Sequence, residues 1–465
     1  DLDAATRYVP PVVTPTRAGG FDQKIAIIGA GPAGLSCAFY LAEKGYKPVV
    51  FEKNERPGGM LTYGIPSFKL EKDVIEAEVE VIRLMGAEFR YGVEVGRDVT
   101  LDELREQGFK AFYVAIGCQG GRLAGIPGED AEDVTVAVDF LREVNSGKID
   151  ALPGHTIVVG GGNVAIDVAR NACRLGSEHV EMFCLESEAQ MPASEEERRE
   201  AIEDGAHISC GWGPKEVHLD DAGRVCGITF KRCTRVFDDE GRFAPEYDEN
   251  DLRRVDADRV VMSIGQSIVW GDLLAGSKVE LGRGQGALAD PQTYQTAEPD
   301  IFVGGDVYTG PSFAIDAIAA GHEAAVSIHR FVQPGSTLTI GRNQRRYTAL
   351  DRDDVVIESY DNASREVARV DREREKAAPF SEYVETFTEE QVRAETARCL
   401  GCGASIVDPN KCIGCGLCTT KCAFDAIHLD RDRPECSTMV KYEQKLPSLG
   451  KYALKRAIKI KFGKK

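Results

Sequence analysis

Short apolar runs alternate with helical periods along the first part of the chain. Residues 24–28 form an apolar run rich in β-branched side chains, which predicts a buried strand, and a helical pattern opens over residues 35–41. A second strand is predicted at 48–51, a helix at 73–85 and another buried strand at 111–116. This alternation predicts an α/β fold built on a parallel sheet.

The turn between the first strand and the first helix has the spacing G-x-G-x-x-G, formed by Gly29, Gly31 and Gly34. The first glycine permits the tight turn, the second lets backbone approach a pyrophosphate, and the third allows close packing of helix on strand. The helix N-terminus offers N–H groups and a positive dipole to the phosphates. Glu52, at the end of the next strand, stands where an acidic residue holds the ribose hydroxyls of an adenosine.

The same pattern returns 131 residues further on. Gly160, Gly162 and Ala165 take the places of the three glycines, and alanine is permitted at the third place. The strand that follows is predicted at 180–185 and ends at Glu186. Two such fingerprints predict two bound dinucleotides, because a flavin reductase needs FAD and a nicotinamide face to face.

Size and charge set limits on the function. At 465 residues the chain is expected to form about three domains. Its net charge of −18 argues against nucleic acid as the main partner. No apolar run reaches the roughly 18 residues of a membrane-spanning helix, and no signal peptide opens the chain.

The fourteen cysteines fall into two groups. Seven are scattered in mostly apolar surroundings, where free core thiols are expected: Cys37, Cys118, Cys173, Cys184, Cys210, Cys226 and Cys233. The other seven crowd between Cys399 and Cys436, which is typical of a metal site. Free thiols elsewhere in the chain then indicate a reducing compartment, and hence the cytoplasm.

Four of the clustered cysteines follow the spacing of bacterial ferredoxins, C-x2-C-x2-C-x3-C: Cys412, Cys415, Cys418 and Cys422. This run predicts a 4Fe-4S cluster, whereas zinc sites use two separated ligand pairs. In two-cluster ferredoxins the fourth cysteine serves the other cluster. Cys412, Cys415 and Cys418 would then need one more ligand and Cys422 would join a second cluster, with Cys399 and Cys402 as further candidate ligands. Cys436 or a neighbouring subunit would complete that set. We expect two clusters rather than one.

The fold class predicted is α/β, with two Rossmann-like dinucleotide-binding domains, the second inserted in the first, and a small α+β ferredoxin-like domain. Strands are also expected through Ile228 and Phe237, at 260–264 and at 300–306, and helices at 312–332 and from Thr388 to Arg398. The expected divisions are an N-terminal arm (1–20), an FAD domain (21–148 and 285–332), an NAD(P) domain (149–284), a linker (333–388), the iron–sulfur domain (389–436) and a basic tail (437–465).

The combined motifs resemble the glutamate synthase small-subunit group of flavoproteins, which also includes flavin subunits of electron-bifurcating NAD(P)H/ferredoxin oxidoreductases. The stretches that carry the resemblance are GAGPAGL at 29–35, RPGGMLTYGIP at 56–66, GGGNVAIDVAR at 160–170, MPAS at 191–194 and GGD at 304–306. Together they cover about residues 22–332. The resemblance implies FAD, NADH or NADPH, and electron transfer within a larger complex.

The resemblance also implies which residues bind. For FAD the candidates are Gly29, Gly31, Pro32, Ala33, Gly34, Glu52, Lys53, Gly59, Met60, Leu61, Ile65, Gly117, Gly305 and Asp306. For NAD(P) they are Gly160, Gly162, Asn163, Val164, Ala165, Glu186 and Gly265. For the clusters the candidates come from the cysteine spacing instead: Cys399, Cys402, Cys412, Cys415, Cys418 and Cys422. No side chain is assigned as a catalytic acid or base.

Departures from the group refine the prediction. The group's N-terminal iron–sulfur domain has its own cysteines, but none precedes Cys37, so that domain is absent, truncated or supplied by another chain. NADPH-specific members place paired arginines after the second strand. Here Glu186 stands there, and a carboxylate suits a free ribose diol and repels a phosphate. NADH is therefore favoured, although Arg198 and Arg199 keep NADPH open.

The exit for electrons also departs from a common pattern. No C-x-x-C lies near either fingerprint, so the dithiol that a disulfide reductase uses is missing. We therefore predict an oxidoreductase subunit that moves hydride between NAD(P)H and FAD and single electrons between FAD and 4Fe-4S clusters. The alternatives are a glutamate synthase small subunit that feeds a synthase partner, and a structural relay with a vestigial nucleotide site.

The C-terminal tail reverses the charge of the chain. Residues 437–465 hold nine Lys or Arg and one Glu, a net charge of +8, which leaves −26 for the rest. A solvated tail, contact with an anionic membrane and docking to an acidic partner are all compatible with this composition. We favour docking, with other redox subunits or a ferredoxin as partners.

Overall fold

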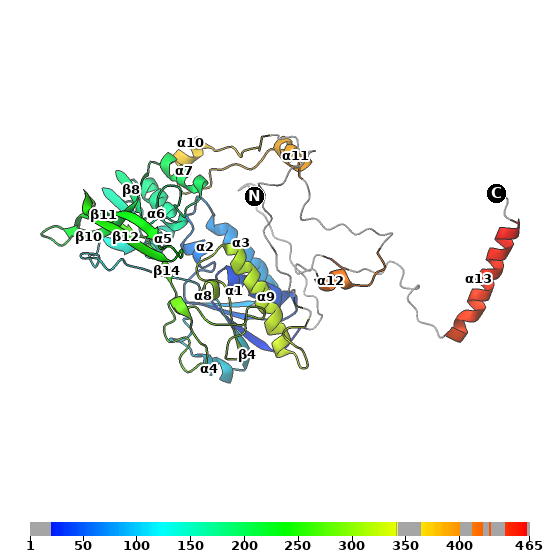
Figure 1. Ribbon diagram of the computed structural model, residues 1–465. Coiled ribbons are helices and arrows are strands. Elements are labelled where there is room, and N and C mark those ends of the chain that lie inside the picture. The colour runs from blue at the N-terminus through cyan, green and yellow to red at the C-terminus, as the bar shows by residue number, and fades with distance from the viewer. Residues whose placement is uncertain are drawn as a thin grey trace. The chain divides into compact units, whose positions relative to one another are not determined.

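The computed structural model describes residues 20–340, 342, 364–399, 412–421, 427–428 and 442–462 (Figure 1). The chain divides into two compact units, one of residues 1–339 and 361–398 and the other of residues 340–360 and 399–465. Both nucleotide fingerprints lie in the first unit, which is built from two Rossmann-like domains.

A five-stranded parallel sheet carries the first fingerprint, with the strand order β15-β4-β1-β2-β3. Its strands are β1 (Lys24–Ile28), β2 (Val49–Glu52), β3 (Glu88–Tyr91), β4 (Phe109–Val114) and β15 (Ile301–Val303). The observed β1 spans the predicted residues, and every side chain from Ile25 to Ile28 is buried, as the apolar run predicts. The fingerprint turn follows β1 between β2 and β4, where the strand order reverses and open α/β sheets bind their ligands.

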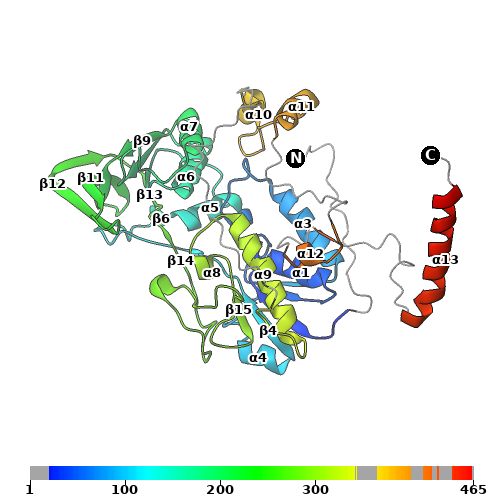
Figure 2. The ribbon, with the colours of Figure 1, turned by 45° about the vertical axis from the view of Figure 1, so that its right-hand side comes forward.

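Two helices cover one face of this sheet, α1 (Pro32–Glu43) and α9 (Ala314–Val332), as both views show (Figure 2). They pack backbone to backbone, since a Cβ on Gly321 would lie 2.2 Å from the carbonyl oxygen of Ala33. The small residues of α9 therefore serve this packing. The remaining helices of the first domain are α2 (Met60–Tyr63), α3 (Lys72–Leu84), α4 (Leu101–Glu106), α8 (Asp306–Thr309) and the 3-10 helix η1 (Arg283–Gln285).

The second domain repeats the topology, with the parallel order β6-β13-β7-β8-β9. Its strands are β6 (Val134–Val136), β7 (His155–Val159), β8 (His179–Cys184), β9 (His207–Cys210) and β13 (Arg259–Met262). One face is covered by α5 (Ala137–Asn145), α6 (Asn163–Arg174) and α7 (Glu195–Glu203). The other is covered by an antiparallel sheet of β10 (Trp212–Leu219), β11 (Val225–Phe237) and β12 (Phe243–Val255).

The chain crosses between the domains on a two-stranded ribbon, β5 (Gly120–Gly121) paired with β14 (Gln266–Ser267). Both crossings come earlier than the expected boundaries at residues 148 and 284. The strand β6 already belongs to the second sheet, and Leu273 is back in the core of the first domain. The ribbon is tight, because a Cβ on Gly121 would lie 2.3 Å from the Cβ of Val136.

The expected linker returns to the body in its described part. It carries α10 (Arg372–Ala377), and a bridge joins Val370 to Val384. The next helix, α11 (Glu389–Ala397), opens the stretch expected to be the iron–sulfur domain, but it belongs to the first compact unit. The predicted capping box of α11 is present, since Thr388 and Gln391 exchange hydrogen bonds. We call residues 371–383 the strap, because they contact both nucleotide domains.

The strap is anchored by charged and aromatic groups. Two arginines of α6 bind the strap. Arg170 donates a hydrogen bond of 2.6 Å to Tyr383 Oη, and Arg174 pairs with Glu375 at 2.7 Å. The backbone N–H of Glu382 donates to Glu71 of the first domain at 3.2 Å. The strap therefore ties the second domain to the residues just before α3.

The second unit contains α12 (Leu417–Lys421) and α13 (Tyr442–Phe462) in its described part. The described side chains of α13, residues 443–461, are all exposed. Among the described residues, no helix is both long and apolar enough to cross a membrane.

Candidate functional site

The first fingerprint has the geometry that its glycines predict. Gly29 adopts a φ of +103°, and a Cβ there would lie 2.4 Å from the carbonyl oxygen of Ala115. A Cβ on Gly34 would lie 1.9 Å from the carbonyl oxygen of Gly29, so α1 packs against the turn itself. Gly59 approaches Gly31 closely enough that its Cβ would stand 2.9 Å from the Gly31 Cα. These glycines leave room for a phosphate over the N-terminus of α1.

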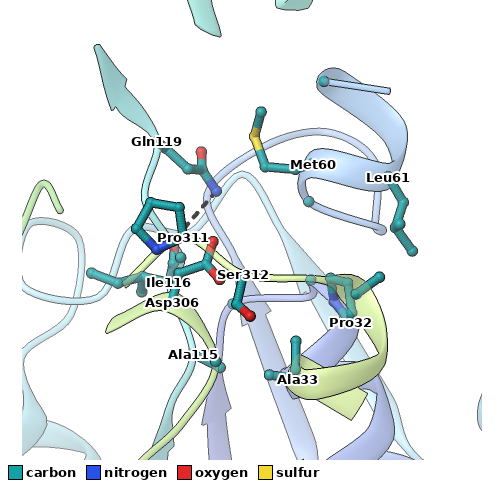
Figure 3. A pocket seen from close by; sticks show the side chains of 18 of the residues that line it. Pro32, Ala33, Met60, Leu61, Ala115, Ile116, Gln119, Asp306, Pro311 and Ser312 are labelled. Atoms are coloured by element: carbon teal, nitrogen blue, oxygen red, sulfur yellow. Dashed lines mark hydrogen bonds between the residues drawn. The ribbon is translucent and has the colours of Figure 1, made fainter. Parts of the chain in front are cut away.

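A pocket opens over this turn, and we call it the first pocket (Figure 3). It encloses ≈ 1060 Å³ of space, part of which is open to solvent. Its labelled side chains come from α1 (Pro32, Ala33), α2 (Met60, Leu61), the end of β4 (Ala115, Ile116, Gln119) and the region of α8 (Asp306, Pro311, Ser312). Mostly apolar walls with a few polar groups suit a flat ring system attached to phosphates.

Two acidic residues line the first pocket in different ways. Glu52 is 3% exposed and accepts hydrogen bonds from the backbone N–H of Ala30 at 2.8 Å and of Asn54 at 2.9 Å. A carboxylate has further lone pairs, so Glu52 can still accept from a ribose hydroxyl. Asp306 opens α8, and burial raises the pKa of its carboxyl.

Hydrogen bonds to its backbone hold the segment of residues 61–65, which borders the first pocket. Lys72 donates to the carbonyl oxygens of Leu61 at 2.8 Å and Ile65 at 2.5 Å. Burial, assisted by the nearby charge of Arg56, lowers the pKa of Lys72 to about 8. Asn145, from α5 of the second domain, donates to the carbonyl oxygen of Gly64 at 3.3 Å. The segment is therefore held from both domains.

A second pocket surrounds the second fingerprint. Gly160 has a φ of +143°, and a Cβ there would lie 2.3 Å from the carbonyl oxygen of Ser263. Glu186 lies beyond the end of β8 and reaches over the fingerprint loop, with Oε2 placed 3.1 Å from a Cβ on Gly161. Glu186 is also the one charged side chain among the described residues that line this pocket.

The two pockets meet at three shared residues, Val164, Gln266 and Pro311. Val164 stands in the first turn of α6, Gln266 on the crossing ribbon, and Pro311 just before α9. Neither Gln266 nor Pro311 stands in a motif that would mark it as a site residue from the sequence alone. Their place indicates where the reacting ends of two nucleotides would come together.

An ionic cluster lies at the edge of this junction. Asp167 of α6 lines the first pocket and accepts a hydrogen bond of 2.6 Å from Lys69, which also pairs with Glu197 of α7. Burial raises the pKa of Asp167 to about 6, although Lys69 opposes the rise. Burial also disfavours the charge of Lys69, but its two acidic partners outweigh that effect and raise its pKa. The cluster joins the first domain to the second.

The predicted nucleotide residues divide into those that line a pocket and those that support one. All but one of the expected FAD residues line the first pocket or a smaller pocket next to it: Gly29, Gly31, Pro32, Ala33, Glu52, Lys53, Gly59, Met60, Leu61, Ile65, Gly117, Gly305 and Asp306. The second pocket is lined by Gly160, Gly162, Asn163, Val164, Glu186 and Gly265. Gly34 and Ala165 are both buried and pack helix on strand.

The predicted cluster ligands are described only in part. Cys399, Cys412, Cys415 and Cys418 are exposed free thiols, while Cys402 and Cys422 lie outside the described residues. Gly414 has a φ of +66°, and its N–H donates to the Cys412 Sγ at 3.4 Å. Backbone N–H groups turned toward sulfur in this way suit an iron–sulfur cluster. Within the described residues no group of three or more His, Cys, Asp or Glu is placed to hold a metal.

Of the seven scattered cysteines, four are buried and three are partly buried, and all are free thiols. Burial raises the pKa of Cys118 and of Cys173 to about 12, and it also raises the pKa of Cys37. The thiols of Cys184 and Cys210 approach to 3.6 Å at the ends of β8 and β9. That pair lies beside the second pocket, so it does not replace a dithiol over the first.

Two parts of the chain match known protein families. Residues 23–321 match the family of pyridine nucleotide-disulphide oxidoreductases, and residues 405–428 match a 4Fe-4S binding domain. The match confirms the predicted fold class, and the solved structure of Mycobacterium tuberculosis FprA in complex with NADPH shares the fold. It has a TM-score of 0.56 at 19% identity over 67% of this chain and 84% of FprA.

Three curated relatives align over most of the chain. The beta subunit of the NADP(+)-dependent formate dehydrogenase of Moorella thermoacetica is 35% identical over 82% of this chain and 54% of its own length. The Escherichia coli glutamate synthase [NADPH] small chain is 36% identical over 67% of this chain and 69% of its own length. The E. coli NAD-dependent dihydropyrimidine dehydrogenase subunit PreT is 34% identical over 67% of this chain and 68% of its own length. The chain thus spans about half of the first relative and about two thirds of the others.

Proposed function

The chain belongs to the pyridine nucleotide-disulphide oxidoreductase family, and from that premise we propose that it is the NADH-oxidising flavin subunit of a larger redox complex. FAD, when bound, supplies the conversion between a two-electron hydride and single electrons, and 4Fe-4S clusters carry the single electrons. The residues of this chain bind and orient the two nucleotides.

The residues around the first pocket suit FAD. The fingerprint glycines and the N-terminus of α1 would hold the pyrophosphate, and Glu52 the adenosine ribose. The flat ring system would lie along the segment that Lys72 and Asn145 support. Val164, Gln266 and Pro311 would then set the contact between this ring and the nicotinamide.

The observation that carries the choice of NADH is the charge at the end of the second pocket. A 2′-phosphate would meet Glu186 and, among the described lining residues, no cation to offset it. Arg198 donates to the carbonyl oxygen of Glu188 at 2.7 Å, and Arg199 lies near Glu196 and Glu203. Neither arginine is among the described residues that line the pocket.

Anaerobic stopped-flow reduction of the bound flavin tests the proposal. We expect NADH to bleach the flavin at least tenfold faster than NADPH at limiting concentration. Glu186→Gln is expected to narrow that ratio, while Glu188→Gln, an exposed neighbour, leaves it unchanged. A tenfold or greater preference for NADPH would overturn the NADH assignment, and failure of both nucleotides would favour a structural relay.

A glutamate synthase role is the second candidate, since one relative carries that name. The 4Fe-4S match at residues 405–428 favours the redox complex instead, because it provides a carrier for single electrons on the same chain. Purification of the native complex would decide between them: a glutaminase/synthase chain that co-elutes would support the second candidate.

A further inference from the structure

The second pocket extends beyond Glu186 onto residues that neither fingerprint contains. Five aromatic or proline side chains from the antiparallel sheet line it: Trp212 and Pro214 of β10, and Phe243, Pro245 and Tyr247 of β12. This sheet lies beside the second domain and is labelled β10, β11 and β12 (Figure 1). The first fingerprint domain has no such sheet among its described strands.

The three lining residues of β12 follow the period of a strand. Phe243, Pro245 and Tyr247 stand at alternate positions and all three line the pocket, although the pairing of β12 with β11 shifts its register along this stretch. The residue between the last two, Glu246, instead pairs with Arg235 of β11. The alternation therefore separates an apolar, ring-bearing side from a charged one.

Contacts hold Tyr247 in place. A Cβ on Gly213 would lie 2.4 Å from a Tyr247 ring carbon, so the ring rests directly on the β10 backbone. The Nζ of Lys231 lies 4.1 Å from the ring centroid and is itself bound to Glu249 at 2.8 Å. The ring is thus fixed before any ligand arrives, and the nearby cation is already paired.

We call Phe243, Pro245 and Tyr247 the wall of the second pocket. The wall adjoins the end of β8, where the ribose would be held. The same Cβ on Gly213 would lie 2.9 Å from the Cδ2 of Leu185, so Leu185, Gly213 and Tyr247 meet. The N–H of Gly211 donates to the carbonyl oxygen of Glu186 at 2.9 Å, which ties the start of the sheet to the same strand end. A base attached to a ribose at Glu186 would therefore come to rest against the wall.

We propose that Phe243, Pro245 and Tyr247 form the adenine subsite of the dinucleotide, with the purine stacked on this wall. A flat aromatic base gains from contact with rigid rings and prolines, and such stacking does not depend on hydrogen bonds. The inference rests on the proposed use of NADH and adds where its adenosine end binds. Hydride transfer occurs at the opposite end, so the wall acts on binding and not on chemistry.

The test separates the two ends of the nucleotide. Phe243→Ala and Tyr247→Ala are each expected to raise the KM for NADH about tenfold and to leave kcat within twofold. Both should leave flavin reduction by reduced nicotinamide mononucleotide unchanged, because that substrate has no adenosine. Titration calorimetry with ADP-ribose, which involves no hydride transfer, should show the same tenfold loss of affinity.

Leu252→Ala is the matched control, since Leu252 lies on the same strand at 46% exposure and is not among the described lining residues. It should change none of these constants. The subsite would be overturned if the variants lost flavin reduction by NADH and by reduced nicotinamide mononucleotide to the same extent. Unchanged affinity for ADP-ribose in folded variants would overturn it too. If wild-type protein is not reduced by NADH at all, the proposed function fails instead, and the ADP-ribose titration still decides the subsite.

Discussion

Gly34 and Ala165 occupy matching places in the two fingerprints, yet only one of them tolerates a methyl group. A Cβ on Gly34 would lie 1.9 Å from the Gly29 carbonyl oxygen, whereas Ala165 fits with no exposed surface. We expect Gly34→Ala to destabilise the first domain by about 1–3 kcal/mol through overpacking, and to lose FAD. Flavin absorbance after gel filtration and the thermal midpoint measure both effects.

Gly162→Ala provides the contrast, because its Cβ would meet nothing within 4 Å and its φ of −90° suits alanine. This variant should keep its thermal midpoint and its flavin, with any loss confined to binding of NADH. A Gly34→Ala protein that retains full flavin content at the wild-type midpoint would contradict the packing argument.

Lys72 makes the stability of the folded protein depend on pH. Its folded pKa of about 8 lies below the ordinary value of 10.5 because burial disfavours the ammonium. Between those pH values the unfolded chain binds more protons, so this group makes the protein more stable as the pH rises. The gain is limited to about 3 kcal/mol over the window.

Replacement of Lys72 by methionine should remove this dependence and release the carbonyl oxygens of Leu61 and Ile65. We therefore expect the difference in thermal midpoint between wild type and Lys72→Met to grow from pH 8 to pH 10. A difference that stays constant over that range would show that the lysine does not titrate there.

At the scale of elements, the strap depends on a few buried polar contacts. Arg170 is 1% exposed and is held by Asp204, Glu200 and Tyr383. Tyr383→Phe would leave one guanidinium N–H of Arg170 without its acceptor in a buried place. We expect a loss of about 1–3 kcal/mol, measured by thermal unfolding.

Tyr452→Phe on α13 is the matched control for this change, since that side chain is 61% exposed. It should leave the midpoint unchanged. If Tyr383→Phe is equally silent, the strap does not contribute to the stability of the second domain through this contact.

The elements that could be predicted are those whose pattern is local. The strand Lys24–Ile28, the helix capped by Thr388 and the glycine turns follow from neighbouring residues alone. The crossing ribbon could not be predicted, because Gly120 and Gly121 pair with residues 266–267, nearly 150 positions away. The wall around Tyr247 was missed for the same reason: its residues read as ordinary strand positions until the fold brings them to Glu186.

At the scale of the whole molecule, the two units divide the predicted chemistry. The first unit contains both nucleotide pockets, and the second contains the predicted cluster cysteines. The thiols scattered through the first unit, residues 37–233, lie outside the ferredoxin spacing, and four of the seven are buried. Hydride exchange and single-electron transfer are therefore expected to be separable by mutation.

Cys415→Ser tests that separation, because Cys415 stands in the middle of the ferredoxin spacing and touches neither nucleotide pocket among their described linings. We expect the variant to keep its flavin and its rate of flavin bleaching by NADH, and to lose the electron paramagnetic resonance signal of the cluster that Cys415 binds. Cys226→Ser, a change to a cysteine of the scattered group, is the control and should lose neither. Iron analysis of the anaerobically purified wild type should give about eight irons per chain, four for each cluster. About four irons would exclude the second cluster, and loss of flavin bleaching in Cys415→Ser would show that the two reactions are not separable.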